Sequence, residues 1–251
     1  MMQKKSLVNR INLFFRSLLF TVFMSTVTFF YGIFCLFARF LPFRYRYAII
    51  MFWTSTMVWA LKHLCQVDYQ IEGLENIPKD RVGVILSKHQ STWETFLLPT
   101  LFHQAAIILK KELLWVPFFG WGLAIIDPIA INRSDKSNAM DQVISKGKIC
   151  LEKKRWILVF PEGTRIPPGE IGKYRLGGAR LAVATNVPVI PVAHNAGYHW
   201  PKRGFIKTPG TIRVVIGPLI ETTDRSAEEV MSQAKDWIEE TVLKLGSPTS
   251  I

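Results

Sequence analysis

The chain of 251 residues is 49% hydrophobic and carries a formal net charge of +12 at pH 7. Its length accommodates one sizeable domain with an additional segment, and its charge indicates an anionic partner such as lipid, a small phosphorylated molecule, an acidic protein or nucleic acid. A nucleic-acid binder does not need long uncharged apolar segments, so the composition favours a membrane over nucleic acid. The three cysteines, Cys35, Cys65 and Cys150, form no Cys-x-x-Cys motif, and we expect reduced thiols.

Two apolar segments lie near the start of the chain. Residues 17–38 carry no charge and are long enough to span a bilayer as a helix, which disfavours a cleaved signal peptide. Residues 47–61 are also uncharged and contain Trp53 and Trp59, which is typical of an interfacial or re-entrant helix. Basic residues flank the first segment on both sides, so a spanning helix and a hairpin that enters and leaves one leaflet are both open.

The rest of the chain alternates strand-like and helix-like stretches. Gly73, Pro78 and several charges mark residues 66–80 as a boundary, and we expect a membrane-associated segment of residues 1–65 and a domain of residues 66–251. Strands are predicted at 82–86, 105–109, 125–131, 156–160, 187–192 and 212–216, with helices including 136–153, 175–185 and a final one opened by the capping box Ser226-x-x-Glu229. This pattern predicts an α/β fold with a mostly buried mixed sheet flanked by helices, preceded by an N-terminal membrane-embedded two-helix segment.

The stretch Ser87-Lys88-His89-Gln90-Ser91-Thr92-Trp93-Glu94 follows the first of these strands. His89 and Glu94 would point about 140° apart within one helix. They can meet if His89 precedes a helix and Glu94 lies in its first turn. The carboxylate would then orient the imidazole as a general base.

Three further blocks follow in the chain. They are Ile129-Ala130-Ile131-Asn132-Arg133, Phe160-Pro161-Glu162-Gly163-Thr164-Arg165 and Val187-Pro188-Val189-Ile190-Pro191-Val192. Together with the histidine block, in this order, they resemble the glycerolipid acyltransferase family, which includes the 1-acylglycerol-3-phosphate acyltransferases. The chain departs from the usual pattern at Glu94, where most members have aspartate, and at Lys88, where asparagine is common.

The resemblance implies transfer of a fatty acyl group from a thioester to the 2-hydroxyl of 1-acylglycerol-3-phosphate, giving phosphatidic acid. His89 would be the base and Glu94 its partner. Arg165 would bind the acceptor phosphate, because a guanidinium matches phosphate oxygens bidentately. Gly163 would allow close backbone approach, and Glu162 would hydrogen-bond the glycerol or position Arg165. The remaining substrate-binding candidates are Thr164, Arg133 and Lys110.

The same reading sets the expected partners. They are a membrane lipid, the bilayer itself, and acyl-CoA or acyl carrier protein as donor substrate, with no metal, no other cofactor and no nucleic acid. We expect a bacterial-type inner membrane, with the domain facing the cytoplasm. Two alternatives stay open, namely the same transfer to another lysolipid such as a lyso-aminolipid, and a catalytically silent membrane-binding scaffold.

Overall fold

The computed structural model describes residues 2–132 and 139–246. The helices are α1 (Met2–Ala38), α2 (Phe43–Cys65), α3 (Trp93–Leu101), α4 (Phe119–Ala124), α5 (Ala139–Glu152), α6 (Gly177–Ala184) and α7 (Ala227–Leu245). The strands are β1 (Val67–Glu72), β2 (Val84–Ser87), β3 (Ala106–Lys110), β4 (Ile129–Ile131), β5 (Ile157–Val159), β6 (Val189–His194) and β7 (Gly210–Ile216).

Within the described chain the strands form one seven-stranded sheet in the order β1-β7-β6-β2-β5-β3-β4. Neighbouring strands are parallel except β6 and β7, which are antiparallel. The predicted α/β class with a mixed sheet is therefore confirmed. Because β6, β2, β5, β3 and β4 all run in the same direction, their carboxyl ends lie at one edge of the sheet.

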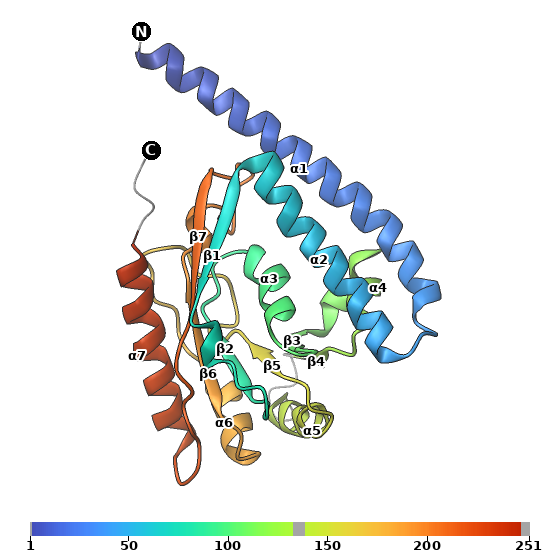
Figure 1. Cartoon of the computed structure of the whole chain (residues 1–251), viewed down its shortest axis with the longest axis vertical. Coiled ribbons are helices and arrows are strands. Elements are labelled where there is room, and N and C mark those ends of the chain that lie inside the picture. Colours follow the sequence, from blue (N-terminus) through green and yellow to red (C-terminus); the bar gives the residue numbers. More distant parts are fainter. Residues whose placement is uncertain (1, 133–138, 247–251) are drawn as a thin grey trace.

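Helices cover both faces of this sheet, and the side chains of β2 show why. Ile85 belongs to the apolar core shared with α1, α2 and α3, whereas Val84 and Leu86 belong to a second core shared with α5, α6 and α7. Alternate residues of a strand point to opposite faces, so an uninterrupted apolar run is buried on both. Figure 1 shows α2 and α3 on one side of the sheet and α7 on the other.

The first two helices lie side by side as an antiparallel pair (Figure 1). Residues Val8–Ala38 of α1 and all of α2 are long and apolar enough to cross a membrane, and the outer face of α1 leaves large apolar side chains such as Phe37 exposed. This surface associates the chain with a membrane. Phe20 of α1 and Met57 of α2 are also fully buried in the core that the sheet shares, so the pair is continuous with the fold.

The second helix is longer than the expected 47–61, because its N-terminal arginines do not end it. Arg46 donates to the carbonyl oxygen of Ile125 (2.7 Å) and pairs with Asp127 (3.3 Å). A charge that is paired in this way can sit at the start of an apolar helix. The helix therefore begins four residues before the uncharged run.

Two strand expectations differ from the structure. The strand expected at 125–131 is confined to Ile129–Ile131, because Asp127 adopts a left-handed φ of 47° and Pro128 lacks a backbone donor. Strand β1 lies within the predicted boundary at 66–80. It is an edge strand in which polar residues alternate with apolar ones, so it lacks a continuous apolar run.

The predicted capping box is present, since Glu229 N–H donates to Ser226 Oγ and Ser226 N–H donates to Glu229 Oε2.

Candidate active site

The predicted site residues that the structure describes lie at the sheet edge where the parallel strands end. His89 follows β2, the Glu162–Arg165 motif follows β5, and Lys110 ends β3. In open α/β sheets such an edge is where ligands bind. A cavity of about 450 Å³ opens here. Its polar lining includes His89, Thr92, Lys110, Gly163, Thr164, Arg165 and Lys202, and its apolar walls include Trp53, Phe96, Phe119 and Leu123.

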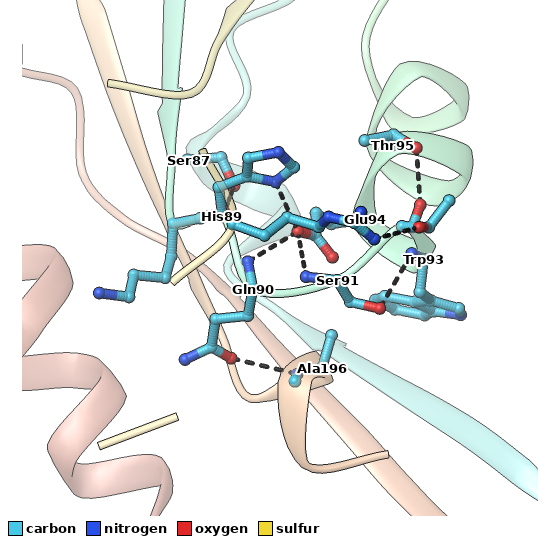
Figure 2. Close-up of polar contacts among 12 residues, drawn as sticks. Ser87, His89, Gln90, Ser91, Trp93, Glu94, Thr95 and Ala196 are labelled. Atoms are coloured by element: carbon cyan, nitrogen blue, oxygen red, sulfur yellow. Dashed lines mark hydrogen bonds and ion pairs between the residues drawn. The ribbon is translucent and has the colours of Figure 1, made fainter. Parts of the chain in front are cut away.

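His89 and Glu94 have the arrangement expected from the sequence. Helix α3 begins at Trp93, so His89 precedes it and Glu94 lies in its first turn. The Nδ1 atom of His89 is 2.9 Å from Glu94 Oε1, and the backbone N–H groups of Gln90 and Ser91 donate to the same oxygen at 2.9 and 2.8 Å. Figure 2 shows these groups converging on the Glu94 carboxylate.

This geometry fixes the tautomer of the imidazole. Burial opposes ionisation of Glu94, but the hydrogen bonds from His89 and from the Ser91 backbone N–H hold the pKa of its carboxyl below the usual range. An ionised carboxylate only accepts, so in the neutral imidazole of His89 the proton is on Nδ1 and the lone pair is on Nε2. An imidazole held in this way is able to take a proton from a group in the cavity.

The motif after β5 holds His89 from several sides. The Phe160 ring stacks on the imidazole with 4.1 Å between centroids. Glu162 Oε2 accepts the backbone N–H of His89 at 2.8 Å, and Ile166 N–H donates to the His89 carbonyl oxygen at 2.7 Å. The base is therefore oriented by two segments that are 73 residues apart in sequence.

Glu162 does not line the cavity. Its side chain is fully buried, and its Oε1 accepts a hydrogen bond from Lys88 Nζ at 2.8 Å. Burial raises the pKa of this carboxyl, while Lys88 opposes the rise. We expected Glu162 to hydrogen-bond glycerol or to position Arg165. Its two carboxylate oxygens instead accept from Lys88 Nζ and from the backbone N–H of His89.

Arg165 and Thr164 line the cavity beside His89. Arg165 donates to Thr92 Oγ1 at 2.8 Å, and Thr164 Oγ1 accepts from Lys202 Nζ at 3.0 Å. Gly163 makes this approach possible, because its φ of 68° is in the left-handed region that favours glycine. Arg165, Lys202 and Lys110 thus surround one cavity with three positive charges. Arg133 lies outside the described residues.

The sequence did not single out Lys202 or His194 as site residues. Lys202 lies in the loop after β6 and belongs to none of the four blocks. The adjacent Arg203 is a sequence signal that could have marked a basic cluster there. His194 ends β6 and is fully buried. Burial lowers the pKa of its imidazole, and the neutral ring donates from Nε2 to the carbonyl oxygen of Lys88 at 2.8 Å.

Among the residues that the structure describes, no cluster of histidine, cysteine or carboxylate side chains could hold a metal.

Comparison with known proteins places this site in a family. The model of the family described as Acyltransferase matches residues 68–195, about half of the chain. The chain belongs to the acyltransferase family. This acyltransferase is 46% identical over 235 residues to a 1-acyl-sn-glycerol-3-phosphate acyltransferase of Pseudomonas aeruginosa, with 92% of this chain and 91% of the relative covered. A Saccharomyces cerevisiae protein with the same description is 28% identical over 200 residues, which cover 76% of this chain and 65% of the yeast protein.

A solved structure shares the whole architecture of this acyltransferase. It is the crystal structure of the 1-acyl-sn-glycerophosphate (LPA) acyltransferase PlsC from Thermotoga maritima, with a TM-score of 0.80 and 28% sequence identity. The match covers 96% of this chain and 99% of that chain. The similarity therefore includes the two-helix segment as well as the sheet.

Proposed function

We propose that this acyltransferase moves a fatty acyl group from an acyl thioester to the 2-hydroxyl of 1-acylglycerol-3-phosphate and so forms phosphatidic acid. The observation that carries the proposal is that His89, oriented by Glu94, faces the same cavity as the guanidinium of Arg165. A base and a phosphate-binding cation in one cavity suit an acceptor that carries both a hydroxyl and a phosphate. The P. aeruginosa and yeast relatives bear the name of this activity.

The transfer is direct. His89 Nε2 accepts the proton of the acceptor hydroxyl, because Nδ1 is engaged by Glu94. The hydroxyl oxygen forms a bond to the thioester carbonyl carbon, the C–S bond breaks, and the thiol leaves with the proton returned from His89. The donor is acyl-CoA or acyl carrier protein, and the route includes no acyl-enzyme and no further cofactor.

The lining of the cavity supports a placement of the acceptor lipid. The phosphate lies among Arg165, Lys202 and Lys110, where charge-assisted hydrogen bonds are available. The acyl chains lie along the apolar wall that α2 and α4 provide, for example at Trp53 and Phe119. That wall is continuous with the membrane-associated helices, so a lipid acceptor reaches the base without leaving apolar surroundings.

We also propose that the membrane is a bacterial-type inner membrane and that the catalytic domain faces the cytoplasm. Free buried cysteines and the basic residues on both sides of the α1 apolar run support this orientation. A hairpin of α1 and α2 in one leaflet would place both of its ends in the cytoplasm. Labelling of a Gln3→Cys variant from outside sealed vesicles would exclude the hairpin.

The decisive experiment is a product analysis with purified protein. We expect phosphatidic acid from 1-acylglycerol-3-phosphate and either acyl donor, and a loss of at least about a hundredfold in kcat for His89→Ala. His103→Ala is the matched control, because His103 is exposed and is not among the described residues that line the cavity. A wild-type kcat in folded His89→Ala would contradict the assignment of His89 as the base. Preferential acylation of another lysolipid would show that the acceptor is that lysolipid. No transfer to any lysolipid would favour a catalytically silent scaffold.

A further inference from the structure

A lysine is completely buried next to the proposed base. Lys88 directly precedes His89 and has no exposed surface. Its Nζ atom donates to Glu162 Oε1 at 2.8 Å, to Glu239 Oε1 at 2.8 Å and to the carbonyl oxygen of Glu170 at 3.3 Å. An ammonium has three donors, so each has an acceptor within 3.5 Å. Lys88 occupies the position where asparagine is common in the family. All three N–H donors of its ammonium have an acceptor.

Glu239 reaches this cluster from the C-terminal helix. Helix α7 packs on the face of the sheet opposite α2 and α3, and most of its charged side chains point to solvent, as Glu240 does. The Glu239 side chain is only 11% exposed. Its Oε1 also accepts the hydroxyl hydrogen of Tyr174 at 2.7 Å. Glu239 therefore accepts hydrogen bonds from two donors outside α7, Lys88 and Tyr174.

We propose that Lys88 and Glu239 are positioning residues for His89. Glu239 fixes the Lys88 ammonium, Lys88 fixes Glu162 through Oε1, and the other oxygen of Glu162 accepts the backbone N–H of His89. This series of charge-assisted hydrogen bonds joins α7 to the base, and its link between Glu239 and Lys88 connects residues 151 positions apart. The inference rests on the proposed function of His89 and extends it to the C-terminal helix.

Stability alone is a poor explanation for this cluster. Buried ion pairs pay a large desolvation cost, and apolar replacements of similar size are often as stable or more stable. Two carboxylates and one ammonium in the interior are hard to account for as a packing solution. A role that requires fixed direction, such as holding a backbone N–H in place, is one that hydrogen bonds fulfil and apolar contacts do not.

The first test uses neighbouring glutamates of α7. We expect Glu239→Ala to lower kcat about tenfold, since small displacements of a base are costly, with the KM for the acceptor unchanged. Glu239→Gln keeps an acceptor for Lys88 and Tyr174 and should recover kcat to within about twofold of wild type. Glu240→Ala is the matched control, because Glu240 is exposed and, within the described part of the chain, forms its ion pair with Lys244 on the surface. A wild-type kcat in folded Glu239→Ala, or no recovery in Glu239→Gln, would overturn the positioning role.

The second test removes the lysine and reads the His89 backbone directly. Lys88→Met leaves Glu162 and Glu239 opposed without a cation, so we expect a larger fall in kcat and faster hydrogen–deuterium exchange at the His89 amide than in wild type. Adding Glu239→Gln to Lys88→Met removes one of the opposed charges and should restore part of both. Unchanged exchange in Lys88→Met would overturn the inference. Because exchange does not depend on turnover, a wild-type protein without transferase activity would count against the proposed function and leave this test intact.

Discussion

Arg165 and Lys202 approach the cavity from different loops, and each is held by a threonine hydroxyl. Thr92 accepts from Arg165, and Thr164 accepts from Lys202. Neither cation forms an ion pair with a carboxylate among the residues that the structure describes. A neutral partner orients a cation without cancelling its charge, so both remain available to an anionic ligand.

Substitution of these cations should change recognition of the phosphate more than the chemistry. We expect Arg165→Ala to raise the KM for 1-acylglycerol-3-phosphate about 10- to 100-fold, Arg165→Lys to restore part of the loss, and Lys202→Ala to have a smaller effect in the same direction. Steady-state kinetics with Arg203→Ala as an exposed neighbouring control would measure this. An unchanged KM in Arg165→Ala would remove the phosphate-binding role.

His194 gives the site a calculable pH dependence of stability. Its folded-state pKa is lowered by burial, so below the ordinary value of 6.5 the unfolded chain takes up a proton that the folded chain does not. Stability is therefore lost as the pH falls through 6.5, by up to about 1.4 kcal/mol per pH unit from this group.

A variant without this titrating group should lose less stability than wild type as the pH falls below 6.5. In His194→Gln the amide still donates to the Lys88 carbonyl oxygen, but it takes up no proton in either state. We expect the fall in Tm between about pH 7.5 and 5.5 to be smaller in this variant than in wild type. Thermal unfolding in matched buffers measures the difference, and an equal fall in both proteins would show that His194 does not titrate on unfolding.

At the scale of elements, the sequence predicted the parts of the site that follow buried strands. The runs before His89 and Glu162 are apolar on both faces, which identifies β2 and β5 and puts both motifs at strand ends. The contacts of Lys88 with Glu239 could not be predicted, because no periodicity relates residues 151 positions apart. Helix α4 was missed because its six residues are too few to show a helical repeat.

The contact between α1 and α4 depends on a glycine. A Cβ atom added at Gly32 would lie 2.4 Å from the Cα of Phe118 and 2.5 Å from its Cβ. Glycine normally destabilises a helix relative to alanine by about 1 kcal/mol. The presence of Gly32 in the middle of α1 therefore indicates that the close approach of the α1 and α4 backbones stabilises the fold by more than the glycine costs in helix propensity.

We expect Gly32→Ala to destabilise the protein despite its better helix propensity. Overpacking of this kind costs about 1–3 kcal/mol, and a shift of α4 would also move Phe119, which lines the cavity. The variant should unfold at lower temperature in detergent and lose activity, whereas Thr26→Ala at an exposed position of α1 should do neither. A Tm at or above that of wild type would show that the backbones can separate without cost.

For the whole molecule, the boundary predicted between residues 65 and 66 separates two stretches of chain that share a core. Phe20, Met57 and Leu61 are fully buried against residues of the sheet, including Val214. Arg16 of α1 also donates to the carbonyl oxygen of Leu64 at 2.7 Å. The two apolar helices and the sheet that carries the cavity are therefore parts of one continuous structure.

Division of the chain at that boundary should consequently fail to give an independent domain. Residues 66–251 alone would expose the apolar surface that α1 and α2 cover, so we expect a fragment that aggregates or unfolds without a cooperative transition. Co-expression of residues 1–65 as a separate chain should restore a soluble complex in detergent that purifies as one species, because the buried contacts are non-covalent. If residues 66–251 unfolded cooperatively on their own, the two-helix segment would be an anchor attached to an autonomous domain, and the cavity wall contributed by α2 would have to be dispensable for folding.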